Sequence, residues 1–203
     1  DSTKSFIFEL LDYFKKGTII VPTFTYSATR GEIFNPIKTP SEIGQFSEIF
    51  RHIKGVHRSS HPIFSVSCIG KKAEYFVESK MTDCFGEGTF FDKLYRNNVK
   101  ILALGCNLNR VTFVHFVEQS LNVSYRYFKN FKGKYVDQNG ERKDVIYKFY
   151  VKDLSKVSMT GIKAETDNQL ISIGAMKKYC FCEENFMTIY LRPALDHLIL
   201  DTT

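Results

Sequence analysis

A short apolar segment, followed by a glycine-led loop and an apolar helical pattern, constrains the fold more than any other part of the chain. Residues 100–104 read Lys-Ile-Leu-Ala-Leu, which is typical of a strand buried on both faces. The loop over residues 105–110 comes next, and a helical pattern begins near Val111. A strand that leads through a loop into a helix is the building unit of α/β proteins. The segment therefore predicts an α/β core.

The rest of the sequence alternates helices and strands as far as residue 123 and then changes character. Helices are expected over residues 5–16, 39–52, 71–78 and 90–96, and strands over residues 18–21 and 63–69. Beyond them, residues 125–131 and 145–151 alternate, and Asn139-Gly140 is a typical hairpin turn between them. The remaining expected elements are a strand over residues 169–173 and a C-terminal helix from near Glu184, kinked or restarted at Pro193. This order predicts one α/β domain over residues 1–203 with an antiparallel β extension in its C-terminal half.

The charge balance raises the question of an anionic partner. The formal net charge is +6, which would suit either a nucleic acid or a cofactor that carries several phosphates. The lysines and arginines are scattered, however, and form no dense run or repeated basic–aromatic motif. A diffuse positive charge is typical of a solvated surface, so we do not expect nucleic-acid binding.

The cysteines and the apolar segments indicate the compartment. The chain has five cysteines, an odd number without zinc-like spacing, which favours free thiols in a reducing cytoplasm. The sequence contains neither a membrane-length apolar stretch nor a recognisable signal peptide. We therefore expect a cytoplasmic protein that does not bind a membrane.

The most informative residues for chemistry are Thr112, His115 and Glu118. They fall three apart, so on a helix they would form one polar stripe among apolar neighbours. The stripe would lie just after the carboxyl end of a strand, which is where ligands bind in open α/β sheets. A carboxylate one turn away can orient an imidazole and prepare it to accept a proton near neutral pH. The stripe therefore predicts a general base at His115.

Two other interpretations of the stripe stay open at this point. His115 and Glu118 could be a buried pair that only satisfies its own hydrogen bonds, because His-x-x-Glu is a weak pattern. A metal site is less favoured, since no Cys, His or carboxylate cluster nearby completes one.

Two further polar segments could contact a ligand. Residues 58–62 read Arg-Ser-Ser-His-Pro and combine a charged fork with hydroxyls and a histidine, which could hold a phosphate or a linear ligand. Residues 22–27 read Pro-Thr-Phe-Thr-Tyr-Ser, and their hydroxyls could bind an extended ligand. An ordinary turn and an ordinary hydroxyl-rich loop are the alternatives. Residues 85–88 have two glycines but lack the lysine of a phosphate-binding loop, so a nucleoside triphosphate site is not expected.

Taken together, five segments in a fixed order resemble the aminoglycoside 3-N-acetyltransferase family. They read PTFTYS at residues 22–27, FNPIKTPSEIGQFSEIFR at 34–51, RSSHP at 58–62, FGEGTFFDKLY at 85–95 and ILALGCNLNRVTFVHFVE at 101–118. Each segment alone is a weak match, but the five segments in this order are a specific one. The resemblance covers residues 18–130, and later residues agree only loosely.

The resemblance implies a three-layer α/β/α sandwich and direct transfer of an acetyl group from acetyl-CoA to a sugar amine, without a metal. In the family's T-x-x-H-x-x-E motif the histidine is the base, which gives that role to His115, with Glu118 orienting it and Thr112 beside the thioester. Segments similar to the family's coenzyme A contacts give cofactor-binding roles to Thr23, Thr25, Tyr26, Ser27, Arg58, Ser59 and His61.

Two departures from the family pattern bear on the expected activity. The family's serine-bearing strand and loop that help to hold the coenzyme are not found before Asp1, so we expect a single acetyltransferase domain without that N-terminal segment. The acidic residues after Glu118 are interleaved with lysines, whereas a pocket for a polycationic aminoglycoside should be rich in carboxylates.

The residues and the resemblance leave three hypotheses for the function. The first is acetylation of a small-molecule amine on an aminoglycoside. The second is N-acylation of a nucleotide-linked amino sugar in polysaccharide or natural-product synthesis. The third is a non-catalytic relative that binds coenzyme A. A homodimer is one option for the assembly.

Overall fold

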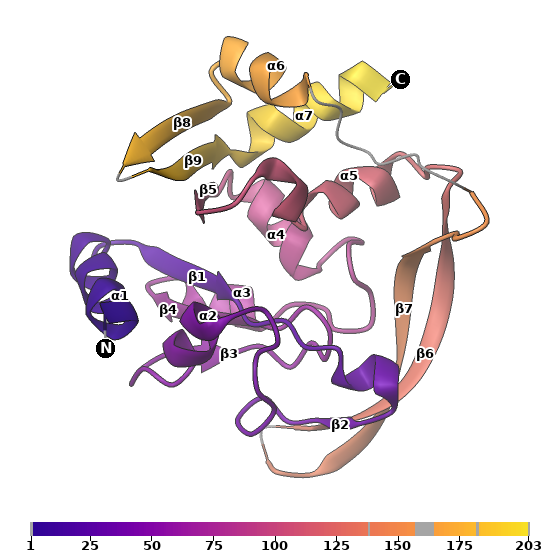
Figure 1. Cartoon of the computed structure of the whole chain (residues 1–203). Helices are drawn as coiled ribbons and strands as arrows, with labels where there is room; N and C mark the ends of the chain where they lie inside the picture. The colour runs from indigo at the N-terminus through magenta and orange to yellow at the C-terminus, as the bar shows by residue number, and fades with distance from the viewer. Residues whose placement is uncertain (1, 138, 157–164, 182, 203) are drawn as a thin grey trace. The chain divides into compact units, whose positions relative to one another are not determined.

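The computed structural model describes residues 2–137, 139–156, 165–181 and 183–202. The chain forms two compact units (Figure 1). The first unit comprises Asp1–Cys84, Gly88–Phe90 and Lys129–Phe149. The second unit comprises Phe85–Glu87, Phe91–Phe128 and Tyr150–Thr203.

The first unit is built on a three-stranded antiparallel sheet in the order β1-β4-β3. Strand β1 (Thr18–Pro22) ends at its proline, as expected, and pairs with β4 (Val66–Gly70), which in turn pairs with β3 (His57–Arg58). The expected strand over residues 63–69 is present but begins later, because the preceding residues form the bend that carries His61.

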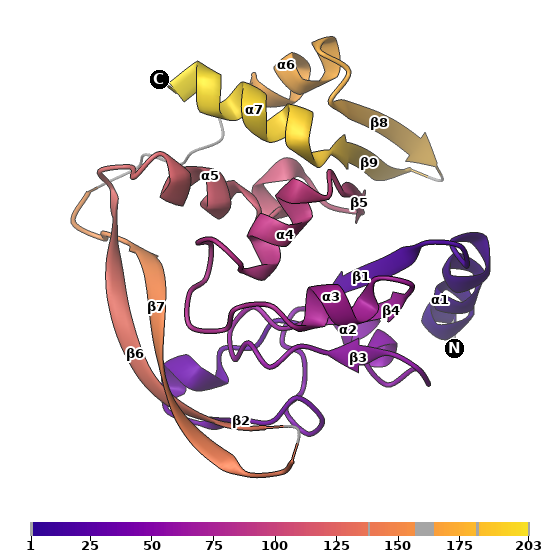
Figure 2. The same cartoon turned by 180° about the vertical axis from the view of Figure 1, so that it is seen from behind.

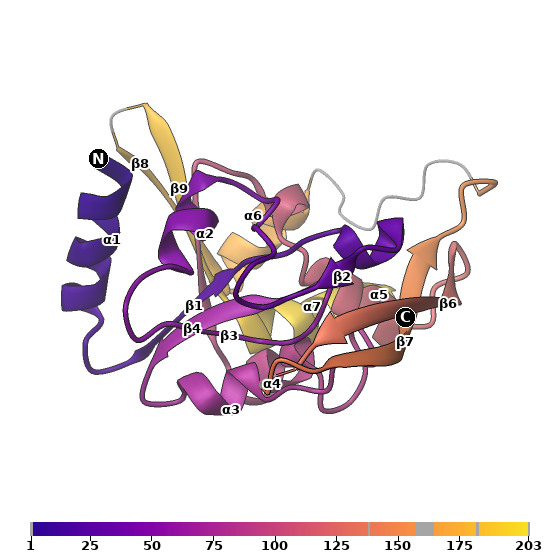
Figure 3. The same cartoon turned by 90° about the horizontal axis from the view of Figure 1, so that it is seen from below.

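Helices cover both faces of this sheet. Helices α1 (Ser2–Tyr13) and α2 (Gln45–Phe50) pack together through the buried side chains of Ile7 and Phe50, which also contact Val21 of β1. Helix α3 (Ala73–Val77) packs on β4, and Figure 3 shows it on the face opposite α2. All three helices differ from the expected ranges: turns replace the last three expected residues of α1, α2 starts only at Gln45, and α3 starts after a turn at residues 71–72.

A second sheet has the order β2-β6-β7. After the short helix η1 (Ser27–Arg30), β2 (Ile33–Phe34) runs parallel to β6 (Arg126–Val136). Strand β7 (Arg142–Lys152) lies beside β6 as the return strand of a hairpin, and Gly140 at the expected turn has φ +81°. The antiparallel extension is therefore confirmed.

The second unit contains a third sheet in the order β5-β9-β8. Strand β9 (Glu184–Tyr190) lies between β5 (Lys100–Leu104) and β8 (Met176–Phe181), and both pairings are antiparallel. Helices α6 (Thr166–Ser172) and α7 (Leu191–Thr202) supply Leu170 and Ala194 to the core over this sheet (Figure 2).

Three expectations for this unit were wrong. Residues 169–173 lie in and just after α6 rather than in a strand, because Thr166 and Leu170, one turn apart, form its buried face. Residues 184–190 form β9 rather than a helix, since Met187 and Ile189 alternate inward with period two, and Pro193 lies in the first turn of α7. Strand β5 occurs where expected but is not buried on both faces: it is at the sheet edge, and Leu102 is 43% exposed.

Helix α4 (Phe90–Arg96) has its expected bounds, whereas α5 (Val114–Ser120) begins three residues later than expected. The intervening residues form the short helix η2 (Leu108–Arg110) and a turn. Helix α5 is fixed by aromatic packing: Phe113 contacts Phe91 of α4, and Phe116 contacts Phe113 and Tyr95. This packing buries one side of α5 and sets the direction of its polar side chains.

The mixed α/β class is therefore confirmed. The four cysteines that fall within the described residues are free thiols, as expected, and Cys182 lies outside those residues. Within the same part of the chain, every helix is too short or too polar to cross a bilayer.

Candidate active site

The side chains of His115 and Glu118 are in direct contact on α5. Nδ1 of His115 lies 2.5 Å from Oε2 of Glu118, which is the contact that their i, i+3 spacing predicts. The Glu118 side chain is 7% exposed, whereas the His115 side chain is 36% exposed. The pair thus has a buried orienting carboxylate and an accessible ring.

Glu118 is held from outside its helix by two residues that follow α5, Tyr125 and Arg126. The Tyr125 hydroxyl donates to Oε1 over 3.0 Å. Arg126 Nε lies 2.7 Å from Oε2 as an ion pair, without the alignment of a hydrogen bond. Burial alone would raise the pKa of Glu118, but the hydrogen bond from His115 and the charges of His115 and Arg126 outweigh it, so the pKa is lowered. The carboxylate is therefore ionised at neutral pH.

An ionised Glu118 fixes the tautomer of His115. A carboxylate only accepts hydrogen bonds, so the close contact requires the proton on Nδ1 and leaves the Nε2 lone pair free to accept one. The Phe85 ring packs edge-to-face with the imidazole, with ring centroids 5.9 Å apart and an interplanar angle of 72°. The arrangement can extract a proton from a group placed against Nε2.

Arg126 and Tyr125 were not among the residues expected from the sequence. Arg126 also donates from Nη1 to the carbonyl oxygen of Tyr150, over 3.1 Å. The Tyr150 hydroxyl in turn donates to the carbonyl oxygen of Val123, over 3.0 Å. A chemical argument could have found them: a buried carboxylate needs hydrogen-bond donors, and Tyr125 and Arg126 lie where the chain enters the first strand after the helix.

Thr112 lies in the turn before α5, so it is not part of the helical stripe that the sequence suggested. It is half-buried, and its carbonyl oxygen accepts a hydrogen bond from the amide of His115 over 3.0 Å. It therefore helps to start the helix that carries the pair.

A hollow of about 410 Å³ opens where β5 ends, in the same unit as the pair. Its lining includes Gly105 and Cys106, the carboxylates of Asp167 and Glu184, and the cations of Arg110 and Lys178. Lys178 Nζ and Asp167 Oδ2 form an ion pair at 2.5 Å. The charges of this lining are balanced rather than strongly acidic.

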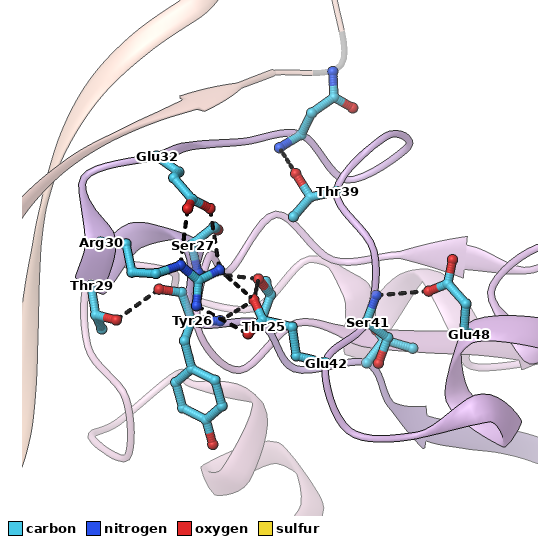
Figure 4. Close-up of polar contacts among 12 residues, drawn as sticks. Thr25, Tyr26, Ser27, Thr29, Arg30, Glu32, Thr39, Ser41, Glu42 and Glu48 are labelled. Atoms are coloured by element: carbon cyan, nitrogen blue, oxygen red, sulfur yellow. Dashed lines mark hydrogen bonds and ion pairs between the residues drawn. The ribbon is translucent and has the colours of Figure 1, made fainter.

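The hydroxyl-rich segment expected to bind the cofactor lies in the first unit, where it is tied to Glu42 (Figure 4). Oε1 of Glu42 accepts from the Thr25 hydroxyl over 2.8 Å and from the Tyr26 amide over 3.0 Å. Arg30 bridges Glu42 and Glu32 on the same side (Figure 4). Its hydrogen bond lowers the pKa of Glu42 to about 2, against the effect of burial. The carboxylate therefore stays ionised and fixes the backbone at Tyr26.

The other expected cofactor residues of this unit also bind the chain itself. Arg58 donates to the carbonyl oxygens of Thr23 and Thr39 and lies over the Phe34 ring. The Ser59 hydroxyl accepts from the Val66 amide over 2.9 Å, and Thr23 donates to the Ser65 carbonyl over 3.2 Å.

His61 is the most deeply engaged of these residues. Its Nδ1 accepts from the amides of Ile63 and Phe64, over 3.2 and 3.0 Å. Nε2 lies 3.3 Å from the Asp83 carbonyl oxygen. Burial lowers the pKa of His61 to about 4, so the ring is neutral at pH 7. His61 therefore holds the turn into β4 in shape.

Two residues of the segment at positions 22–27 have polar groups that could contact a ligand. The Oγ atom of Ser27 is buried and has no hydrogen-bond partner among the described residues. Tyr26 is 46% exposed. An unpaired buried hydroxyl is costly, so Ser27 fits a site that receives a polar ligand group. Among the described residues, no group of three His, Cys, Asp or Glu side chains is placed to hold a metal ion.

Comparison with known protein families matches residues 2–197 to the family described as aminoglycoside 3-N-acetyltransferase. The chain belongs to this family. An aminoglycoside N(3)-acetyltransferase III from Salmonella sp is 28% identical over 99 residues, and a relative of that name from Acinetobacter baumannii is 27% identical over 99 residues. Each of these matches spans 48% of this chain and 35% of the relative, so the chain covers about a third of those proteins.

Two solved structures show the same fold. AAC-IIIb in a binary complex with CoASH has a TM-score of 0.80 at 18% identity and covers 98% of this chain and 82% of its own. Sisomicin-bound AAC-VIa has a TM-score of 0.82 at 16% identity and covers 98% of this chain and 84% of its own. At these identities the likeness establishes the fold.

Proposed function

We propose that this family member is an acetyl-CoA-dependent N-acetyltransferase that acetylates an amine of an aminoglycoside or a similar amino sugar. The observation that carries the proposal is the pair on α5: the accessible His115 ring is held by a buried, ionised Glu118 through Nδ1, which leaves Nε2 as a proton acceptor.

The residues of the pair have separate roles in this reaction. A sugar amine is mostly protonated near pH 7 and must lose a proton before or while its nitrogen forms the amide bond. Nε2 of His115 accepts that proton, and Glu118 stabilises the imidazolium that results. Bound acetyl-CoA would supply the acetyl group as a thioester, whose C–S bond would break as the amide bond forms. Of the two protons that the ammonium loses in all, one would pass to the departing thiolate and the other to solvent. Thr112 stays the candidate donor beside the thioester oxygen.

The coenzyme would be held by the segment at residues 22–27. We assign direct contacts to Ser27, whose hydroxyl has no hydrogen-bond partner within the described part of the chain, and to the exposed Tyr26. Thr23, Thr25, Arg58, Ser59 and His61 would act by fixing the backbone of that site, because their polar groups bind the chain. The AAC-IIIb complex with CoASH, which has the same fold, supports a coenzyme A site in this fold.

The substrate is proposed from the family and from relatives that bind aminoglycosides, such as sisomicin-bound AAC-VIa. The balanced charge of the hollow beside β5 keeps a nucleotide-linked amino sugar as the second candidate, because such an anionic ligand would meet Arg110 there.

Calorimetric titration of acetyl-CoA into the full-length protein, followed by rates with sisomicin and with a nucleotide-linked amino sugar, tests the proposal. Saturable binding and acetylated sisomicin are expected. Acetylation of the nucleotide sugar alone would change the substrate class. Binding of acetyl-CoA without acetylation of either amine would overturn the proposal of an enzyme and favour a non-catalytic protein that binds coenzyme A.

Substitution of His115 by Ala tests the role of the base. We expect turnover to fall by roughly 10²–10⁴-fold while the affinity for acetyl-CoA stays nearly unchanged. His57→Ala is a matched control, because His57 is exposed on β3, in the other unit. Equal rates for the wild type and His115→Ala would show that the ring is not the base.

We also propose four further properties of the protein. They are the family's three-layer α/β/α sandwich, a single acetyltransferase domain over residues 1–203, a cytoplasmic location and a homodimer. The free thiols of the described cysteines support a reducing compartment. Light scattering of the purified protein would test the homodimer.

A further inference from the structure

The Nδ1 atom of His115 has two neighbours that make opposite demands on it. Oε2 of Glu118 lies 2.5 Å away and Nη2 of Arg126 lies 3.0 Å away. If Nδ1 carries a proton, it can donate to the carboxylate, but it cannot also accept from the guanidinium. The Arg126 contact is then an approach of two donors, and it becomes a repulsion between two cations once the imidazole is doubly protonated.

Glu118 and Arg126 therefore act on His115 in opposite directions. A buried carboxylate beside an imidazole favours the charged ring and would tend to keep the base protonated. Arg126 counters this effect, because it binds the same carboxylate at 2.7 Å and places a positive charge next to the ring. The Arg126 side chain is only 12% exposed, so water screens the effect weakly.

Arg126 is fixed well enough to exert this effect steadily. Its Nη1 donates to the Tyr150 carbonyl oxygen, which anchors the guanidinium to β7. Among the described residues, Tyr125 and Arg126 contact the pair, and the pKa of Tyr150 is raised by burial and also by the charge of Glu118. The uncharged Phe85 ring packs edge-to-face with the imidazole from another segment. Tyr125 stays protonated, because burial and the Glu118 charge raise its pKa.

We propose that Arg126 is a positioning residue that fixes the Glu118 carboxylate and whose charge opposes the protonation of the His115 imidazole that this carboxylate favours. The inference rests on the proposed role of His115 as the base. A charge-preserving change should keep this effect, and a neutral change of similar length should remove it.

The test is an NMR titration of the His115 ring in the full-length protein with labelled histidine, with its signal assigned by its loss in His115→Gln. Arg126→Gln should raise the midpoint by roughly one pH unit, as expected when a neighbouring like charge is lost. Arg126→Lys should leave the midpoint near that of the wild type.

Two results would overturn the inference. One is an unchanged midpoint in folded Arg126→Gln. The other is a midpoint in Arg126→Lys that rises as far as in the neutral variant; should Arg126→Gln not fold, Arg126→Met takes its place as the neutral variant. Kinetics add a second readout: the acid limb of kcat/KM should move upward in Arg126→Gln with the NMR midpoint. The NMR titration does not require turnover. It therefore tests the role of Arg126 even if the protein proves to have no acetyltransferase activity.

Discussion

The hydroxyl of Tyr125 donates to Oε1 of Glu118 over 3.0 Å, on the side of the carboxylate that His115 does not use. Oε2 faces His115 and Arg126. Both oxygens of a buried carboxylate are thus engaged, which restricts its rotation and therefore the plane in which the imidazole is held.

Removal of this hydroxyl should loosen the carboxylate without changing its charge. We expect Tyr125→Phe to lower the free energy of unfolding by roughly 1–3 kcal/mol, because a buried hydrogen bond to a charged group is lost. It should lower kcat while the KM for acetyl-CoA stays unchanged. Urea unfolding and initial rates measure the two effects. Tyr127→Phe is the control, since Tyr127 is 49% exposed, and equal behaviour of the two variants would contradict the prediction.

The Glu42 carboxylate should matter for cofactor affinity rather than for the proton transfer. We expect Glu42→Gln to weaken acetyl-CoA binding up to about tenfold, because a neutral amide cannot keep both the Arg30 ion pair and the contacts to Thr25 and Tyr26. Calorimetry gives the dissociation constant. Glu32→Gln is the matched control: Glu32 also pairs with Arg30, and the described contacts of its carboxylate include neither Thr25 nor Tyr26. If both variants bind alike, Glu42 does not shape the site.

Local patterns in the sequence were enough to predict the bounds of some helices and strands but not of others. Helix α4 and strand β5 have their expected bounds. The apolar run at residues 169–173 was ambiguous, because four or five apolar residues fit a strand or one helical face equally well. Packing of Leu170 against the core over β5 and β9 decided for the helix.

In the candidate site, too, some contacts could be predicted from the local sequence and others could not. The contact of His115 with Glu118 follows from helical spacing, which is local. Arg126 reaches the pair only because the chain turns back after α5, so no spacing rule gives its position. Arg58 and His61 show the opposite failure: their residue types suit an anionic ligand, but the backbone around them takes up their hydrogen-bonding groups.

Gly70 is a position where the fold of the first unit should not tolerate a side chain. Its φ is +115°, and a Cβ atom there would lie 2.3 Å from the Gly17 carbonyl oxygen. We expect Gly70→Ala to lower the free energy of unfolding by roughly 3 kcal/mol or more, from clash and backbone strain together. Gly55→Ala separates the two causes, since Gly55 has φ +86° but its nearest contact is Ile69 Cδ1 at 3.6 Å. Equal urea midpoints for the two variants would refute the clash.

His61 should make the stability of the protein depend on pH in a defined window. Its folded-state pKa is about 4 because the ring is buried, whereas an unfolded histidine titrates near 6.5. As the pH falls through about 6.5, the unfolded chain takes up a proton that the folded chain refuses, so stability is lost progressively until about pH 4. The full effect is roughly 3 kcal/mol.

The measurement is the free energy of unfolding in urea at several values between pH 7.5 and pH 4.5, for the wild type and His61→Asn. An asparagine oxygen can accept from the Ile63 and Phe64 amides as Nδ1 does, but it does not titrate. The variant should be less stable at pH 7.5, and the difference should shrink as the pH falls. His57→Asn, at an exposed position, should follow the wild-type slope. Parallel curves for the wild type and His61→Asn would mean that the ring takes up its proton equally in both states, and that its burial does not control acid stability.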